Sequence, residues 1–430
     1  MVTDLSWLTP SVTVALAAAG LLGATGAMVG SFTLLRRESL LGDALAHASL
    51  PGICIAYLLS GRRAPLVLLA GAMLAALVGA AVIVAIRRGS RIKEDAAIGI
   101  VLSVFFGLGI VLLTRIQRME LGDKAGLDRF LFGQAASLTR SDLVLIVVVF
   151  TVVLVATVAF FPLLRVLTFD RDFGRSLGLP MGLVEAGLTL ALVAVVVVGL
   201  QMVGVILIIA TLVTPAAAAR QWTDSLGVML VLAAAIGSST ALAGAAISAR
   251  VAGVPTGPAI VLLSSGVLIA SLLFAPRRGW VAARQRRRRA TRAIREENLL
   301  KDIYRAAEDA GDLAGSVPLA LLLGLRRVSP RRLRRTTNLL RRGGLLREEG
   351  DTLRLTDAGR RAAAGVVRRH RLWELYLTRR LDLAPDHVHR DAEAMEHVLS
   401  EQTVERIDDL LGRPTTDPHG RNIPRDDEPA

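Results

Sequence analysis

The chain has 430 residues, of which 53% are hydrophobic, and its mean hydropathy is +0.52. These values exclude an ordinary soluble protein, in which apolar residues are fewer and come in short stripes. The formal net charge is +14, and residues 277–430 hold 33 of the 51 Lys and Arg residues and five of the six His residues. The single cysteine, Cys54, excludes disulfides within the chain and cysteine-based zinc sites. The composition therefore predicts two dissimilar parts.

The first part is predicted to be an all-α polytopic membrane protein. A spanning helix needs roughly 20 apolar residues to cross about 30 Å of hydrocarbon. About nine transmembrane helices fit the apolar stretches, and counts of eight or ten remain open. The predicted spans are residues 12–35, 39–60, 64–86, 95–114, 143–164, 182–200, 202–219, 226–248 and 256–275.

Basic residues indicate the orientation of these helices. Seven arginines lie between positions 277 and 289, directly after the last apolar stretch. Since Lys and Arg are enriched on the cytoplasmic side of membranes, we expect a multi-pass protein of the plasma membrane with its C-terminal part in the cytoplasm. With nine helices, the N-terminus is expected outside the cell.

Ionisable residues within membrane spans are rare and usually functional. Asp43 and His47 lie four residues apart at the start of the second predicted span, so they share one helix face. A carboxylate and an imidazole on one face can bind Mn²⁺, Zn²⁺ or Fe²⁺. The alternative is an Asp–His ion pair that stabilises the helix bundle.

The chain supplies no nucleotide-binding motif of the P-loop type. That motif ends in Gly-Lys followed by Ser or Thr, and Ile, Asp and Leu precede the three lysines, Lys93, Lys124 and Lys301. An energy-driven transporter built on this chain would need a separate ATPase, docked from the cytoplasm. Residues 169–180 (FDRDFGRSLGLP) are predicted as a short polar helix that ends in Gly-x-Pro. An ordinary surface loop is the alternative for this segment.

Residues 36–52 (RRESLLGDALAHASLPG) resemble the signature of the ABC-3 family of metal-importer permeases. Residues 201–217 resemble that family's broken core helix, and residues 254–261 resemble its last span. The resemblance covers about residues 10–278, which we take as the permease domain at residues 1–278. It implies that Asp43 and His47 form a metal-binding gate. It also implies an ATPase-coupling helix, with candidate residues Phe169, Asp170, Arg171, Gly174 and Gly178.

The same resemblance implies a set of partners. The chain would be a transporter subunit rather than an enzyme, and ATP would be bound only by the partner ATPase subunit. A second permease subunit, identical or different, and an extracellular metal-binding protein would complete the importer in the lipid bilayer. The cargo would be a divalent metal ion, with Mn²⁺ favoured over Zn²⁺ and Fe²⁺.

Beyond a basic linker at residues 279–293, residues 294–363 predict three helices and a β-hairpin. The helices are expected at residues 294–310, at 317–325 and from Ser329-Pro330 to about Arg342, where Gly343-Gly344 ends the third. Residues 345–356 predict the hairpin, as in a winged-helix domain. The third helix carries a candidate DNA-binding set near its start, as in recognition helices: Ser329, Arg331, Arg332, Arg334 and Arg335. A winged helix used only for protein contacts is the alternative.

Residues 364–430 contain two groups of potential metal ligands. His370 and Glu374 are four residues apart on one predicted helix. The second group falls on one face of the next helix and suits a transition ion: His389, Glu393, Glu396 and His397. A charged surface helix is the alternative, which the presence of two groups disfavours.

The segment from about Glu296 to Pro424 resembles the diphtheria-toxin-repressor family of metal-dependent regulators. The resemblance rests on residues 356–360 (TDAGR), 369–374 (RHRLWE), 396–400 (EHVLS) and 415–424 (TTDPHGRNIP). It implies a cytoplasmic winged helix followed by a helical metal-binding and dimerisation domain. The two groups of ligands would form two metal sites in that domain, with operator DNA as a further partner. Carboxylate at Glu393 favours Mn²⁺, whereas iron sensors of the family carry Cys there.

This chain departs from the family's pattern on the first helix of the regulator. Asn298 stands where the family has a Met or Asp ligand, and Lys301 stands where manganese sensors have Glu. An ammonium cannot ligate a cation and repels one nearby, so these two positions predict a weakened, altered or lost metal sensor.

Two interpretations remain open from the sequence. In the first, the chain is the permease of a metal importer with a metal-responsive regulatory domain. In the second, it is a membrane-tethered or proteolytically released metal-dependent repressor. The intact pair of Asp43 and His47, together with the coupling segment, favours the first.

Overall fold

A computed structural model describes residues 9–61, 65–118, 138–205, 207–251, 253–326, 329–381, 383, 395–397 and 399–425. The chain forms two compact units, Met1–Ala283 and Arg284–Ala430. Their boundary falls within the basic segment that separates the two parts of the sequence. Each unit is described by itself.

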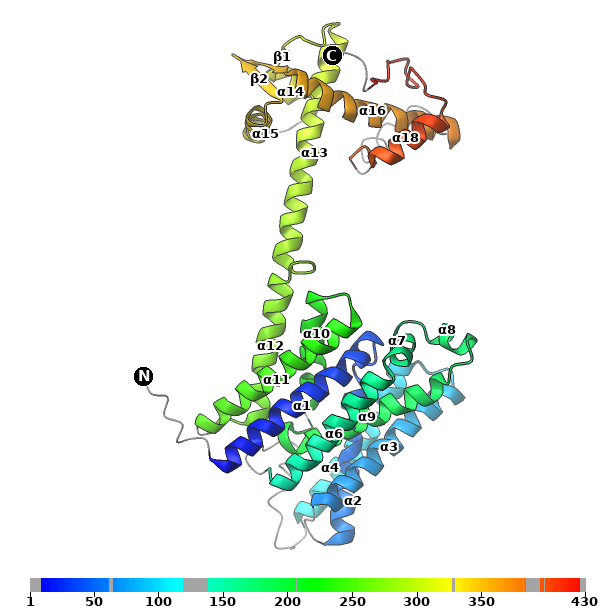
Figure 1. Ribbon diagram of the computed structural model, residues 1–430, viewed down its shortest axis with the longest axis vertical. Coiled ribbons are helices and arrows are strands. Elements are labelled where there is room, and N and C mark those ends of the chain that lie inside the picture. Colours follow the sequence, from blue (N-terminus) through cyan, green and yellow to red (C-terminus); the bar gives the residue numbers. More distant parts are fainter. Residues whose placement is uncertain are drawn as a thin grey trace. The chain divides into compact units, whose positions relative to one another are not determined.

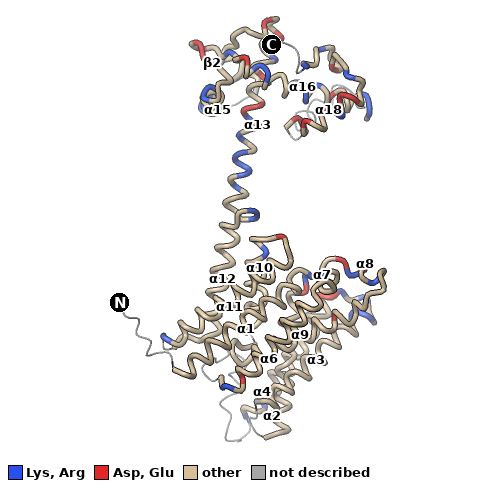
Figure 2. The backbone as a smooth tube through the Cα atoms, in the orientation of Figure 1, with Lys and Arg blue, Asp and Glu red and all other residues tan. Residues whose placement is uncertain are grey.

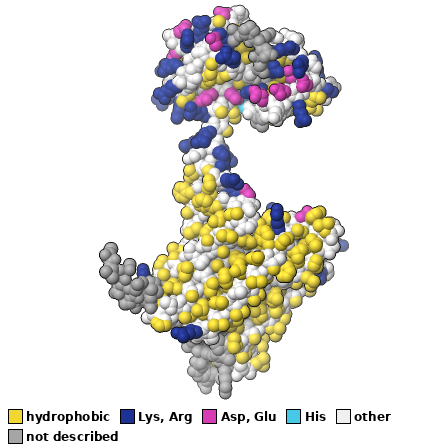
Figure 3. Space-filling view, viewed as in Figure 1, with side chains coloured by type: hydrophobic (Ala, Val, Ile, Leu, Met, Phe, Trp, Pro, Cys, Tyr) yellow, Lys and Arg dark blue, Asp and Glu magenta, His cyan; other side chains and the backbone are white. Residues whose placement is uncertain are grey.

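The described part of the first unit is helical throughout (Figure 1). Eight of its helices are long and apolar enough to cross a membrane. Their hydrophobic side chains cover the visible face of the bundle, as the space-filling view shows (Figure 3). These eight are α1 (Pro10–Leu35), α2 (Leu41–Ser60), α3 (Pro65–Gly89), α4 (Glu94–Arg118), α6 (Arg140–Ala159), α9 (Met181–Val203), α11 (Leu226–Arg250) and α12 (Thr256–Phe274).

The seventh predicted span, residues 202–219, is not one continuous helix. Helix α9 continues to Val203 and is ended by Gly204, whose φ of 87° is a conformation that L side chains rarely adopt. The chain resumes as the 15-residue helix α10 (Ile208–Trp222). The predicted break of a core helix in this region is therefore present, whereas the uninterrupted span drawn across it is wrong.

The fifth predicted span, residues 143–164, is also divided. Helix α6 ends at Ala159, and α7 (Phe161–Phe169) begins directly after it with a proline in its first turn. Proline is favoured there because the first-turn N–H has no acceptor within the helix. The short helix α8 (Arg171–Ser176) follows. Together α7 and α8 carry the chain from α6 to α9.

Glycine allows the helices to touch backbone to backbone. A Cβ built on Gly23 of α1 would lie 2.3 Å from the carbonyl oxygen of Gly237 on α11, and the reverse distance is also 2.3 Å. A Cβ on Gly52 of α2 would lie 2.1 Å from the carbonyl oxygen of Gly71 on α3. Such contacts replace the hydrophobic driving force that is missing between helices in lipid. They fix α1 against α11 and α2 against α3.

The arginine-rich linker is helical. Helix α13 runs from Trp280 to Asp309, so the helix predicted to begin at residue 294 starts 14 positions earlier. Figure 2 shows the concentration of basic residues along it. Its later turns bury Leu299, Leu300, Ile303 and Tyr304 in the core of the second unit, which anchors the helix there.

The predicted winged helix is present in the second unit. Strand β1 (Val317–Pro318) precedes α14 (Leu319–Arg326), where the sequence predicted helix alone. Helix α15 (Pro330–Arg342) begins after Ser329 and ends at Gly343-Gly344, as expected. Strands β2 (Leu346–Glu349) and β3 (Thr352–Leu355) form the predicted hairpin. The antiparallel sheet has the order β1-β3-β2, with Leu353 opposite both Val317 and Glu348.

Helix α16 (Asp357–Arg380) follows the hairpin, and α18 (Glu401–Leu410) packs on it through Leu372, Leu375, Val404 and Ile407. The completely buried guanidinium of Arg371 contacts both carboxylate oxygens of Glu308 on α13, at 3.0 and 2.5 Å. It also donates to the carbonyl oxygen of Asn422. One buried cation therefore joins α13, α16 and the segment after α18.

Gly52→Val tests the close contact of α2 and α3. We expect a loss of about 3 kcal/mol or more of stability, because the new side chain would overlap the backbone of α3. The measurement is the thermal unfolding of the detergent-solubilised protein. Gly107→Val on α4 is the matched control, since a Cβ there meets no atom within 4 Å. Equal melting temperatures for the two variants would contradict the packing described.

Candidate functional site

Helix α2 carries both predicted gate residues in its first two turns. Asp43 Oδ1 and His47 Nε2 lie 3.6 Å apart, and the two side chains are 25% and 14% exposed. The imidazole packs edge-on against Phe106 of α4, with ring centroids 4.6 Å apart. This contact orients the His47 ring, so that the pair presents a carboxylate and an imidazole side by side.

One nitrogen of this pair has no partner. His47 Nδ1 is buried and makes no hydrogen bond within the described structure. The nitrogen that faces Asp43 is Nε2, on the other side of the ring. One carboxylate and one imidazole are donor types that divalent transition ions accept.

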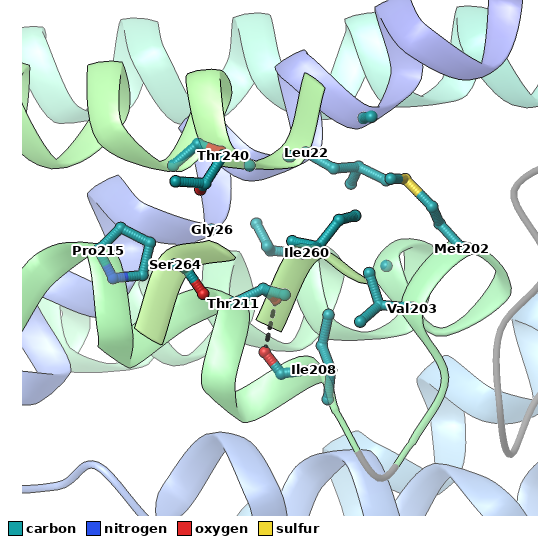
Figure 4. A pocket seen from close by; sticks show the side chains of 16 residues that line it. Leu22, Gly26, Met202, Val203, Ile208, Thr211, Pro215, Thr240, Ile260 and Ser264 are labelled. Carbon is teal, nitrogen blue, oxygen red and sulfur yellow. Dashed lines mark hydrogen bonds between the residues drawn. The ribbon is translucent and has the colours of Figure 1, made fainter. Parts of the chain in front are cut away.

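A small cavity lies elsewhere in the bundle, beside the break between α9 and α10 (Figure 4). Its volume is about 20 Å³, enough for about one water molecule. Thr211, Thr240 and Ser264 line it, and each hydroxyl donates to a carbonyl oxygen of its own helix. Asp43 and His47 do not line this cavity, so it is separate from the candidate gate.

The predicted coupling segment folds as the end of α7, the helix α8 and a turn. Asp170 is the N-cap of α8, and its Oδ1 accepts a hydrogen bond of 2.9 Å from the backbone N–H of Phe173. Gly174 lies so close to Val166 and Met181 that a Cβ would come within 2.8 Å of both side chains. Gly178 has a φ of 76°, which ends the turn before α9. The two glycines therefore shape the segment.

Two aromatic rings project from this segment. Phe169 and Phe173 are 58% and 54% exposed. They line a surface hollow of about 940 Å³, together with Phe161, Arg165 and residues 224–227 at the start of α11. Exposed aromatic residues beside a hollow are typical of a protein-docking surface.

A cluster of charges that no sequence motif indicates joins this segment to its neighbours. Glu185, in the second turn of α9, accepts hydrogen bonds from Arg36 at 3.0 Å and Arg87 at 3.1 Å, and it pairs with Arg171 of α8. Arg36 also contacts Glu38 at 2.6 Å, just before α2. Glu185 could have been identified from the sequence as a lone acidic residue within an apolar helix.

In the second unit, Glu396 is the centre of a buried ionic cluster. Its Oε1 lies 2.5 Å from Lys301 Nζ, and its Oε2 lies 2.5 Å from His370 Nδ1. The other nitrogen of His370 contacts Glu374 Oε1 at 3.0 Å. His397 Nε2 lies 3.3 Å from Glu396 Oε1, and its Nδ1 contacts Glu297 at 2.5 Å. The cluster thus unites Lys301 with four of the predicted metal ligands.

The electrostatics of this cluster favour an ionised Glu396. Burial by itself raises the pKa of a carboxyl group, but hydrogen bonds from His370 and Lys301 outweigh it and hold the pKa of Glu396 below its usual value. Asn298, one turn before Lys301, has a buried side-chain oxygen that accepts no hydrogen bond from the described residues. The cation that compensates Glu396 in this structure is the lysine ammonium.

The remaining predicted ligands, His389 and Glu393, lie outside the described residues. Within the described part of the chain, no three His, Cys, Asp or Glu side chains are arranged to hold a metal ion. The residues described around Glu396 do not fit a resident divalent ion, because an ammonium already lies at hydrogen-bonding distance from the central carboxylate.

The candidate DNA-binding residues lie on the exposed face of α15. Leu333, Thr337 and Leu340 are buried and face the core. Arg331, Arg332, Arg334 and Arg335 are exposed, as is Ser329, the N-cap residue. Arg332 also lines a hollow of about 870 Å³ against α13 and α14. The helix therefore presents a basic surface beside the hairpin.

Comparison with protein families covers both units. Residues 9–275 match the model of the ABC 3 transport family, which is more than half of the chain. The chain belongs to the ABC 3 transport family. In this ABC 3 chain, residues 356–425 match a second model, the iron dependent repressor metal binding and dimerisation domain. The permease and repressor-like parts anticipated from the motifs are thus both present.

Individual relatives agree with this assignment. The ABC 3 chain is 39% identical to the manganese transport system membrane protein MntC of Bacillus subtilis, over 91% of this chain and 89% of the relative. It is 46% identical to the zinc transport system membrane protein TroC of Treponema pallidum, over 63% and 91%. Among solved structures, PsaBC from Streptococcus pneumoniae in complex with Fab matches with a TM-score of 0.57 and 31% identity, over 65% of this chain and 98% of that one.

Proposed function

We propose that this chain is the permease subunit of an ABC importer for divalent transition metal ions, with Mn²⁺ as the preferred cargo and Zn²⁺ or Fe²⁺ as alternatives. Membership of the ABC 3 family and the similarity to manganese and zinc transport proteins support metal transport. The observation that carries the proposal further is the pair of Asp43 and His47 on α2, whose Oδ1 and Nε2 atoms lie 3.6 Å apart on one helix face.

The chemistry of the pair fits a cargo that must be released again. One carboxylate offsets part of the charge of a divalent ion, and one imidazole adds a ligand of intermediate softness. Thiolates, which would hold Zn²⁺ or Cu⁺ strongly, are missing from the pair. Two ligands from one chain leave the remaining coordination positions to water or to a second permease subunit. Binding of this kind is specific enough to select an ion and weak enough to let it pass.

The proposed importer contains further subunits, the first of which is an ATPase. The three lysines of this chain have no P-loop context, so we propose a separate ATPase subunit that alone binds ATP. Phe169 and Phe173, exposed beside the hollow on α7 and α8, support docking of that subunit there. A second permease subunit and an extracellular metal-binding protein complete the proposed assembly. The chain lies in the plasma membrane, with the C-terminal unit on the cytoplasmic side together with the ATPase.

Asp43→Ala and His47→Ala test the proposed gate. We expect each change to abolish uptake of ⁵⁴Mn in vesicles that contain the assembled transporter, because each removes one of the few ligands in the pathway. Parallel assays with ⁶⁵Zn and ⁵⁵Fe identify the preferred ion. The amount of assembled complex should stay the same in both variants.

Asp95→Ala is the matched control for this experiment. Asp95 is an exposed carboxylate in the first turn of α4 and has no place in the proposed gate. Normal uptake by this variant is expected. Normal uptake by both gate variants would refute the assignment of Asp43 and His47.

For the C-terminal unit, we propose a role in pairing two chains and in regulating the transporter. The match of residues 356–425 to a repressor's metal binding and dimerisation domain supports this. DNA binding is a second candidate function, as in a tethered or released repressor. The exposed arginines of α15 beside the β2–β3 hairpin favour it, since a helix of this kind enters the major groove in winged-helix proteins.

DNA binding can be tested with the full chain in lipid nanodiscs. If α15 reads DNA, selection from a random duplex library should yield a palindromic sequence. The double change Arg331→Ala and Arg335→Ala should then weaken binding by at least about tenfold, as loss of base and phosphate contacts does. Arg361→Ala, an exposed arginine on α16, is the control. Failure to enrich any sequence would leave pairing and regulation as the role of this unit.

A further inference from the structure

Lys301 has an environment that is rare for a lysine. Its side chain is 1% exposed, and its ammonium lies 2.5 Å from Glu396 Oε1, whose side chain is completely buried. Burying an ammonium costs several kcal/mol unless a well-placed opposite charge compensates it. The pair joins α13 to the segment before α18, across 95 positions of sequence.

The pair is surrounded by carboxylate and imidazole groups. Glu396 contacts Lys301 and His370 through different oxygens, His370 contacts Glu374, and His397 lies 3.3 Å from the same oxygen that meets Lys301. These are carboxylate and imidazole donors, the ligand types that divalent transition ions prefer. The positive charge at their centre is supplied by the chain itself.

We infer that the Lys301 ammonium takes the place of a divalent ion in this cluster. It keeps the side chains of the cluster in contact when no metal ion is bound. An ammonium donates hydrogen bonds and cannot act as a ligand, so a metal ion at Glu396 Oε1 would have to displace it. Displacement would break a hydrogen bond between two buried charges, and disrupting a buried ion pair is strongly destabilising. The contacts of this cluster are therefore kept at every metal concentration, and the cluster does not report metal.

Hydrogen–deuterium exchange of the full chain in nanodiscs tests this inference. Peptides from α13 and α16 should exchange at the same rate in MnCl₂, in ZnCl₂ and in EDTA. Lys301→Met removes the ammonium and should raise exchange in these peptides by at least about a hundredfold in EDTA, as expected when one partner of a buried pair is lost. MnCl₂ should reverse part of that change. Lys301→Glu should respond to MnCl₂ more strongly still.

Lys301→Arg is the matched control, because it keeps the charge and should remain indifferent to metal. Metal-dependent exchange of α13 and α16 in the unaltered chain would overturn the inference. It would also be overturned if Lys301→Met and Lys301→Glu behaved like the unaltered chain in all three solutions. Exchange of peptides from α2 is measured separately, so metal binding at Asp43 and His47 does not affect the exchange rates read for α13 and α16.

A second inference rests on Glu185 and on the proposed coupling of this chain to an ATPase. The carboxylate of Glu185 meets three guanidinium groups from three separate parts of the first unit. Arg171 comes from α8, Arg87 from the end of α3, and Arg36 from the connection between α1 and α2. The Glu185 side chain is 12% exposed, so these pairs are largely shielded from water.

This cluster forms a continuous path from α8 to α2. Arg171 meets Glu185, Glu185 meets Arg36, and Arg36 meets Glu38, which lies three positions before the start of α2. Asp43 and His47 follow in the first two turns of that helix. A displacement of α8 would therefore act on Glu185 first, and on the start of α2 through the Arg36–Glu38 pair.

We propose that Glu185 is a positioning residue that links the docking segment to the candidate gate. Shielded ion pairs are suited to this role, because removing or moving one partner leaves the others with uncompensated charge. The three guanidiniums cannot all keep their contacts when one of the elements moves. The cluster therefore favours a small number of discrete arrangements over a gradual change.

Glu185→Gln tests this role in the assembled transporter. We expect the ATPase subunit to bind and hydrolyse ATP as before, while metal taken up per ATP falls about tenfold, within the usual range of coupling between sites. Exchange at residues 38–47 should change on ATPase binding in the unaltered chain but not in Glu185→Gln. Glu185→Asp should restore part of both effects, which a loss of general stability would not explain.

Glu94→Gln is the control, because within the described part of this cluster Glu94 pairs with Arg87 and not with Arg36 or Arg171, and its side chain is 34% exposed. An unchanged response of residues 38–47 in Glu185→Gln would overturn the inference. This readout needs no cargo. Absence of Mn²⁺, Zn²⁺ and Fe²⁺ uptake by the unaltered complex would instead count against the proposed function, so the two failures are distinct.

Discussion

Helices in a bilayer gain little by hiding apolar side chains, because lipid is as apolar as they are. They are held together by close packing, and in the first unit that packing depends on glycine. Gly23 faces Gly237, and Gly52 faces Gly71, with no room for a Cβ at any of the four. The second contact fixes α2, and with it the proposed gate residues Asp43 and His47, against α3.

The two units compensate their buried charges differently. In the first, one carboxylate, Glu185, is shared by three arginines from separate elements. In the second, the carboxylate of Glu396 contacts one lysine and two imidazoles, those of Lys301, His370 and His397, and it is completely buried.

Much of the fold could be predicted from hydropathy and local signals. Long apolar runs located the eight long helices, and Ser329-Pro330 with Gly343-Gly344 located α15. The break after Val203 could not be placed from hydropathy, because its residues are as apolar as the helices on either side. The helical state of the arginine run was missed because repulsion between like charges favours a solvated linker, and tertiary packing of α13 was not visible.

The candidate site shows the same limit. The spacing of Asp43 and His47 predicted their contact, since both lie on one helix. The sequence identified Lys301 as a departure that would oppose a metal ion, but not its partner, because Glu396 is 95 positions away. Glu185 carried no motif, and its three partners come from distant segments. Contacts within an element follow from local spacing, whereas contacts between elements depend on the fold.

A tethered cation has a thermodynamic consequence that a diffusible one does not. A domain that binds a metal ion gains stability in proportion to the logarithm of the free ion concentration once that exceeds the dissociation constant. Lys301 is covalently part of the chain, so its effective concentration at Glu396 is constant. The contribution of this cluster to the folding equilibrium of the C-terminal unit would thus be independent of the metal concentration in the cell. Two chains that pair through such a unit would remain paired when metal is scarce, which is when an importer is most needed.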